Sequence, residues 1–220
     1  MFLFVALRTL FRSIFPPIRS VFMATPSRLV LGTGNAGKVD ELRALLADLP
    51  IEIVPGHTLD APPDVEEDAD TLTGNAQKKA AAYHDHTGLP ALADDTGLEV
   101  AALDGRPGVH TARFAGPDAT PDDNKRKLLD VLDGVDDRRA RFRTVVALVD
   151  DAGRTRTFEG VCTGTITTAP RGDGGFGYDP LFRPDGHEQT FAEMPPDAKN
   201  EISHRRKALD ALRSFLANGE

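Results

Sequence analysis

One stretch near the start of the chain, LVLGTGNAGKV over residues 29–39, restricts the fold most strongly. A short apolar run passes into a glycine-rich turn that ends at a lysine, which is typical of a strand followed by a helix. The backbone N–H groups of such a turn and the positive end of the helix dipole both favour an anion. The stretch therefore predicts an α/β unit with a phosphate site, the alternative being an ordinary strand-to-helix connection.

Two familiar phosphate-binding patterns match this turn only in part. Gly32, Gly34 and Gly37 fit the G-x-G-x-x-G of dinucleotide-binding proteins. Gly32, Gly37 and Lys38 fit a P-loop until its last position, where Val39 has no hydroxyl to offer Mg²⁺. The two patterns agree on an anion and disagree on the chemistry.

A third pattern, T-x-N-x-x-K, consists of Thr33, Asn35 and Lys38 and groups two short polar side chains with an ammonium at a helix N-terminus. The rival dinucleotide interpretation, an NAD(P) oxidoreductase, requires an acidic residue at the end of the second strand to hold a ribose. The candidate, Glu52, lies inside the predicted strand, and Pro55 stands where that strand should end. The dinucleotide interpretation is therefore the weaker one.

Strand and helix signals alternate along the rest of the chain, which favours an α/β class. The loop over residues 57–74 is too long for a simple connector, and loops of this length are usually functional. Gly97 and Gly108 are expected to be turn residues. The periodicity predicts helices over 36–49, 75–87, 121–132 and from 203 onward, and strands over 28–33, 51–54, 90–93, 98–103, 139–149 and 155–167, the last two as a hairpin.

Two groups of carboxylates are candidates for a metal site. Residues 64–70 (DVEEDAD) hold five acids in seven positions, and Asp94 and Asp95 follow the predicted strand 90–93. Ligands of open α/β sheets bind at strand ends. Adjacent residues point to opposite faces if the strand continues, so only one aspartate can enter a site. One such aspartate and one loop carboxylate would suit Mg²⁺, completed by water and substrate phosphates; the alternative is a solvated acidic loop.

Charge and cysteine content exclude several function classes. The 34 acidic and 26 basic residues give a formal charge of −8, which argues against broad nucleic-acid binding. The single cysteine, Cys162, excludes an intramolecular disulfide and a cysteine metal cluster. It lies in a predicted strand, where a buried structural cysteine is far more common than a catalytic one. A reduced, cytoplasmic compartment is the simplest expectation.

Residues 1–22 form a predicted extension to a domain over 23–220. The extension contains three arginines and no acid, and its longest charge-free run before Arg8 is seven residues. A bilayer-spanning helix needs about 20, so stable membrane insertion is not expected. The favoured interpretation is a start codon placed too early, with Met23 as the true start. Organelle targeting is the second choice, and an interfacial anchor is a further alternative.

Later segments closely resemble a known family. PRGDGGFGYDP (170–180) and FAEMPPDAKNEISHRRKAL (191–209) resemble the signature segments of the inosine/xanthosine triphosphate pyrophosphatase family. Thr33, Asn35 and Lys38, ADDTG (93–97) and GRPGVHTARFAG (105–116) resemble its other motifs, in order, so the resemblance covers 29–216. One departure is Leu-Thr-Gly at 72–74, where the family usually has a phenylalanine and a glutamate. Any role of that glutamate is absent here or supplied elsewhere.

The resemblance implies Mg²⁺-dependent hydrolysis of ITP, dITP and XTP to the monophosphate and pyrophosphate. It also implies an elongated two-lobed α/β fold, with helices flanking a mixed sheet, and a homodimer. Asp95 would bind Mg²⁺ or act as the base for the attacking water, with Glu67 as the partner carboxylate and Glu66 as the alternative. The implied contacts to the triphosphate are Thr33, Asn35, Lys38, Lys79 and Thr96.

Base selection is expected from the two late segments. The FGYD run, Phe176, Gly177, Tyr178 and Asp179, offers a ring for stacking on the purine and a glycine that allows close approach. Inosine and xanthosine carry a carbonyl at C6, whereas the amino group of adenine would leave buried donors unpaired at about 1–3 kcal/mol each. The expected donors are Lys199, His204 and Arg205.

A non-catalytic nucleotide-binding protein is the remaining alternative function.

Overall fold

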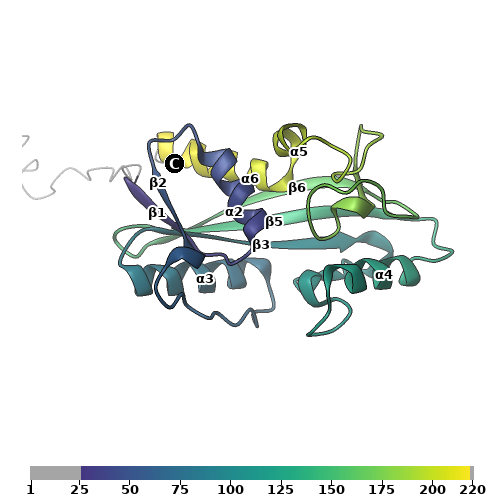
Figure 1. Cartoon of the computed structure of the whole chain (residues 1–220), viewed down its shortest axis with the longest axis horizontal. Helices are drawn as coiled ribbons and strands as arrows, with labels where there is room; N and C mark the ends of the chain where they lie inside the picture. The colour runs from purple at the N-terminus through teal and green to yellow at the C-terminus, as the bar shows by residue number, and fades with distance from the viewer. Residues whose placement is uncertain (1–25, 219–220) are drawn as a thin grey trace, which may run out of the picture.

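The computed structural model describes residues 26–218, and the predicted extension 1–22 lies outside them. The described chain is elongated and is built on one seven-stranded mixed sheet (Figure 1). The strand order is β2-β1-β3-β5-β6-β7, with β4 paired to β3; β1 runs parallel to β2 and β3, and the other pairs are antiparallel. The strands are β1 Arg28–Leu31, β2 Glu52–Pro55, β3 Ala91–Val100, β4 Pro107–Gly108, β5 Arg139–Val149, β6 Thr155–Ile166 and β7 Phe182–Pro184.

Helices cover both faces of the sheet, which confirms the expected fold class. Helices α2 (Ala36–Leu46), α5 (Pro196–Ile202) and α6 (His204–Asn218) lie on one face, and α3 (Leu72–Thr87) and α4 (Pro121–Val131) lie on the other (Figure 1). Side-chain caps fix several helix starts, as for Thr120, which forms a capping box with Asp123 before α4. In the described residues, no helix has the length and apolar character needed to cross a membrane.

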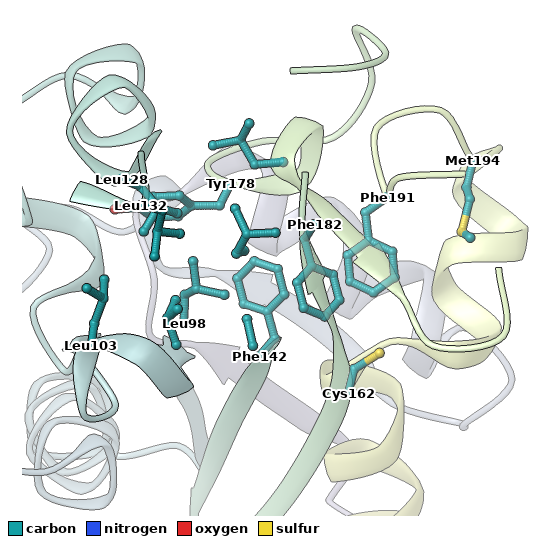
Figure 2. Packing of buried hydrophobic residues seen from close by; sticks show 14 residues of the cluster. Leu98, Leu103, Leu128, Leu132, Phe142, Cys162, Tyr178, Phe182, Phe191 and Met194 are labelled. Carbon is teal, nitrogen blue, oxygen red and sulfur yellow. The ribbon is translucent and has the colours of Figure 1, made fainter. Parts of the chain in front are cut away.

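The hydrophobic core is divided along the long axis. One cluster lies between α4, β7 and the ends of β3, β5 and β6; Figure 2 shows Phe142, Phe182 and Phe191 at its centre, with Cys162 at one side. A second cluster packs α2 and α6 against the sheet, and a third packs α3 against the opposite face. Cys162 is buried in the first cluster, and burial raises the pKa of its thiol to about 11, which fits the structural role expected for it.

The predicted strands 90–93 and 98–103 are wrong as separate elements, because β3 continues through Thr96 and Gly97. Gly97 is therefore not a turn residue. A Cβ at this position would lie 2.7 Å from the carbonyl oxygen of Gly108, so the glycine allows β4 to approach β3 closely. Gly108 does adopt the left-handed backbone typical of turns, with φ of 57°. Asp94 and Asp95 consequently lie in the middle of a strand rather than at its end.

The other element predictions agree with the structure to within a few residues. Helix α3 begins at Leu72 instead of 75, because the Thr71 hydroxyl accepts a hydrogen bond from the N–H of Gly74 and caps the helix earlier. Strands β5 and β6 form the predicted hairpin with continuous antiparallel register. Helix α5 was not predicted from the sequence. Its seven residues end at Ile202, and the next residue, Ser203, accepts a hydrogen bond through its hydroxyl from the N–H of Arg206 in the first turn of α6.

Candidate functional site

A cavity of about 700 Å³ lies between the glycine turn, the acidic loop, the middle of β3 and the start of α6. All the residues predicted for the site line this one cavity, although they come from segments far apart in the chain. The set comprises Thr33, Asn35, Lys38, Glu67, Lys79, Asp95, Thr96, Phe176, Gly177, Tyr178, Asp179, Lys199, His204 and Arg205.

The glycine turn presents its polar side chains at one end of the cavity. Asn35 caps α2 by accepting a hydrogen bond from the N–H of Lys38 at 3.1 Å, and the N–H of Asn35 in turn donates to Thr33 Oγ1. The cap uses the Asn35 oxygen, so its amide hydrogens remain for another acceptor. Burial lowers the pKa of Lys38 against the opposing charge of Asp94, and its ammonium lies 3.3 Å from that carboxylate.

The adjacent aspartates of β3 have different partners, as alternation along a strand requires. Asp94 is fully buried and pairs with Lys38 and with Arg205 at 3.1 Å. Burial alone would raise the pKa of Asp94, but the charges of Lys38 and Arg205 outweigh it and hold the pKa below its usual value. Asp95 instead faces Lys79 and lines the cavity. Asp94 therefore joins α2 and α6 to the sheet, while Asp95 is the aspartate available to a ligand.

Two carboxylates meet around Lys79. Its ammonium lies 3.0 Å from Glu67 Oε1 and 3.8 Å from Asp95 Oδ1. Asn75 donates to Asp95 Oδ2 at 3.1 Å and accepts from the N–H of Ala69, so it links the aspartate to the acidic loop. Burial raises the pKa of Asp95, because the nearby lysines only partly offset the loss of solvent. The second glutamate of the loop, Glu66, is exposed and does not line the cavity.

This donor set fits Mg²⁺ better than a softer metal. Glu67 and Asp95 offer hard oxygen ligands, and Mg²⁺ keeps several waters and substrate oxygens when it binds one or two carboxylates. Residues 26–218 contain no group of three or more His, Cys, Asp or Glu able to hold a metal ion by themselves. A metal at this place would thus depend on water and a ligand for the rest of its coordination.

The aromatic end of the cavity also carries charged side chains. The Lys199 ammonium lies 2.6 Å from Glu41, 2.7 Å from Asp179 and 4.8 Å from the centroid of the Phe176 ring. Asp179 also accepts from the N–H of Phe176, and burial raises its pKa despite the opposing charge of Lys199. Tyr178 is part of the core, and its hydroxyl donates to the carbonyl of Thr111. Phe176 is therefore the ring that lies outside the core, and Asp179 supports the loop that carries it.

His204 and Arg205 begin α6 and are both buried. Arg205 pairs with Asp94 and Glu41, whereas Arg206 pairs with Asp210 on the surface. The His204 ring stacks on Phe142 with centroids 4.7 Å apart, and its Nδ1 is buried without a partner in the described structure. Burial, together with the charges of Arg205 and Lys199, lowers the pKa of His204 well below its usual value, although Asp94 opposes this and Lys38 adds to it. His204 is therefore neutral near pH 7.

The glycine turn and the aromatic loop touch each other. A Cβ at Gly37 would lie 2.8 Å from Cδ1 of Phe176, so only a glycine lets the ring rest on the first turn of α2. Glu52, the acid that a dinucleotide site would need, is exposed at the sheet edge and pairs with Arg28 at 3.3 Å. Gly37, and Gly32 against Tyr83, thus allow close packing, and the dinucleotide interpretation gains no support.

Sequence reasoning missed two residues of this site. Glu41 lies one helical turn after Lys38 and forms ion pairs with both Lys199 and Arg205. Its i,i+3 spacing from Lys38 was the available signal, because it places the acid on the same helix face. Asn75 lies in the first turn of α3, and its two hydrogen bonds, to the acidic loop and to Asp95, depend on the tertiary fold.

Comparison with known proteins matches residues 29–215 to the model of the Ham1 family. The chain belongs to the Ham1 family. It is 51% identical over 190 residues to the dITP/XTP pyrophosphatase of Porphyromonas gingivalis, covering 86% of this chain and 97% of the relative. It is 47% identical over 192 residues to the dITP/XTP pyrophosphatase of Geobacter sulfurreducens, covering 86% of this chain and 96% of the relative. The resemblance inferred from the motifs is confirmed.

Solved Ham1 structures share the fold. The Staphylococcus aureus Ham1 protein is 35% identical with a TM-score of 0.78, covering 88% of this chain and all of that one. The HAM1 protein of Coxiella burnetii is 42% identical with a TM-score of 0.78, covering 86% of this chain and 98% of that one. The names of the relatives agree with the expectation of an enzyme that acts on phosphoric anhydrides.

Proposed function

We propose that this Ham1-family protein hydrolyses non-standard purine nucleoside triphosphates, namely ITP, dITP and XTP, to the monophosphate and pyrophosphate, and so removes them from the nucleotide pool. The observation that carries the proposal is one cavity lined both by cationic and carboxylate side chains and by the Phe176 ring. A nucleoside triphosphate has the matching parts, a polyanion and a purine, joined by a sugar. The relatives named dITP/XTP pyrophosphatase support the same substrate class.

The cationic end would hold the triphosphate. Lys38 and Lys79 supply positive charge, Thr33 and Asn35 supply donors, and the N-terminus of α2 adds its dipole. Thr96 follows the aspartate and would also contact substrate. Fixed positive partners stabilise charge on the leaving pyrophosphate without reorganising at the moment of reaction.

Asp95 and Glu67 would hold Mg²⁺ in this end of the cavity. When bound, the ion would neutralise phosphate charge and help to activate water. Asp95 would also orient the attacking water and accept its proton at a carboxylate oxygen. Asn75 would hold Asp95 in place from α3. The bond broken would be the one between the α and β phosphates.

The aromatic end would select the base. Phe176 would stack on the purine, with Gly177 and Tyr178 shaping the loop around it, and Asp179 would fix that loop through Lys199. Neutral His204 and the cations Lys199 and Arg205 would offer hydrogens to the carbonyl at C6. An adenine amino group would face these donors instead, at about 1–3 kcal/mol for each unpaired contact.

The deciding experiment incubates the full chain with Mg²⁺ and each of ITP, dITP, XTP, ATP and GTP, and measures pyrophosphate and orthophosphate separately. Pyrophosphate release from the first three, with little from ATP, is the expected result. An Asp95→Asn variant, expected to lose about 10²-fold or more in kcat while still binding nucleotide, controls for contaminating enzymes. Orthophosphate alone would mean that another bond is cut, and no release at all would reject the activity.

We also propose that the protein acts as a homodimer, as the family resemblance implies, in the cytoplasm, as its single cysteine suggests. Light scattering coupled to size exclusion measures the mass directly. A species of one chain's mass, 23.7 kDa, at micromolar concentration would reject the dimer.

A further inference from the structure

One wall of the cavity contains a short fixed segment, the 3₁₀ turn η3 (Thr111–Arg113). The N–H of Leu98 in β3 donates to Thr111 Oγ1 at 2.8 Å, and the hydroxyl of Tyr178 donates to the Thr111 carbonyl at 3.0 Å. The side chain of Asn124 in α4 donates to the carbonyl of Ala112 at 2.9 Å. Bonds from three separate elements therefore hold η3 firmly.

The side chain of Arg113 reaches from this fixed turn to the acidic loop. Its Nη2 donates to the main-chain carbonyl of Glu67 at 2.9 Å in a partly buried contact. The other hydrogen bonds of loop residues 60–70 in the described chain link the loop to helix α3. The N–H of Ala69 donates to Asn75 Oδ1, and the side chains of Lys78, Lys79 and His86 bond to loop oxygens. Arg113 is thus the tie between this loop and the wall of the cavity formed by η3 and α4.

We propose that Arg113 is a positioning residue that holds Glu67 in the place where its carboxylate can share a metal ion with Asp95. Arg113 does not line the cavity, so it acts through Glu67 rather than on the nucleotide. A hydrogen bond from a guanidinium is about twice as strong as a neutral one. Metal ligands need supporting contacts to keep their geometry, and losing one typically costs about 10- to 100-fold in metal affinity.

This inference rests on the proposed function, but its first test does not need catalysis. Hydrogen–deuterium exchange of the full chain, measured without metal or nucleotide, should show about tenfold or more faster exchange in residues 60–70 for Arg113→Ala, at the amide of Ala69, whose N–H donates to Asn75. Arg106→Ala is the matched control, because Arg106 also donates to a main-chain carbonyl, that of Leu103, away from the cavity lining. It should leave exchange in residues 60–70 unchanged.

The second test measures metal binding directly, with Mn²⁺ followed by electron paramagnetic resonance. Arg113→Ala should raise the Kd for Mn²⁺ by about tenfold, and Arg113→Lys should restore part of it because an ammonium can still donate to the carbonyl. Arg113→Lys also serves if the alanine variant does not fold. In the enzyme, the Mg²⁺ concentration for half-maximal rate should rise while the KM for nucleotide at saturating Mg²⁺ changes little.

Two results would overturn the inference. The first is an exchange rate in residues 60–70 that is the same in Arg113→Ala as in the wild-type protein. The second is faster exchange with an unchanged Kd for Mn²⁺, which would leave Arg113 a purely structural role. If the wild-type protein released no pyrophosphate, the proposed function would fail, whereas the exchange and Mn²⁺ measurements would still decide the role of Arg113.

Discussion

Asp94→Asn and Asp95→Asn should affect different properties of the protein, although the two residues are adjacent in β3 and the chemical change is the same. At Asp94, the carboxylate pairs with Lys38 through one oxygen and with Arg205 through the other. The asparagine oxygen can face only one of the two cations, so its amide hydrogens must face the other. Lys38 then lies buried next to a donor, without a counter-charge.

The cost follows from the burial of this group. Asp94 is 0% exposed, and removing one partner of a buried ion pair typically costs about 3–5 kcal/mol. That is a large part of the roughly 5–15 kcal/mol by which a domain is stable. At Asp95, the nearest ammonium is 3.8 Å away and is also paired with Glu67, while burial already disfavours the charge. Asp95→Asn should change the unfolding free energy by about 1 kcal/mol or less.

Urea unfolding near neutral pH, without metal or nucleotide, measures both free energies from the transition midpoint and the slope. Pyrophosphate release from dITP measures the turnover of each variant. We expect Asp94→Asn to lose stability first, and Asp95→Asn to lose turnover with its stability kept. Equal losses of stability, or a stable Asp94→Asn protein, would refute the assignment of Asp94 to the scaffold and Asp95 to the site.

Three further predictions use other parts of the structure. Lys38→Ala should weaken triphosphate binding more than monophosphate binding in calorimetric titrations, whereas equal losses would move Lys38 to the proximal part of the nucleotide. Gly160→Ala should destabilise the protein by about 3 kcal/mol in urea unfolding, because a Cβ there overlaps the backbone of His204 and Ala208, and an unchanged midpoint would contradict this packing. His204 has a lowered folded-state pKa, so the unfolded chain binds more protons below about pH 6.5 and stability should fall with pH there, by up to about 1.4 kcal/mol per unit. His204→Gln should remove that part of the slope between about pH 6.5 and pH 5, and the same slope in both proteins would mean that His204 is protonated in the fold.

Local chemistry made much of the fold predictable. The hairpin of β5 and β6 was readable because both strands alternate and Gly153 supplies the left-handed residue of the turn, with φ of 73°. The glycine that closes α3, Gly88, is equally local, with φ of 66° at the helix C-terminus. Gly97 misled because a glycine in a strand resembles a turn glycine in sequence, and the β4 carbonyl that explains it belongs to a segment eleven residues further on.

The candidate site was predictable in its residues and less so in its connections. The cavity-lining residues could be grouped because they match motifs that one family has in this order and spacing. Hydrophobic periodicity and charge alone would not have grouped them. The partner of Lys199, Glu41, lies 158 residues away along the chain, so no local pattern could pair them. The same holds for Arg113 and Glu67, whose contact depends on how η3 faces the acidic loop.

The contact between Phe176 and Gly37 has a consequence for the size of the substrate. Because the Phe176 ring packs against the first turn of α2, the aromatic platform and the phosphate-binding turn are held next to each other. Under the proposed function, the two parts of the substrate that they bind, purine and triphosphate, would have to fit this fixed arrangement together. A compound with a longer or shorter link between purine and triphosphate could reach the aromatic ring or the phosphate-binding turn but not both. The enzyme would therefore select its substrates by the length of this link as well as by the base.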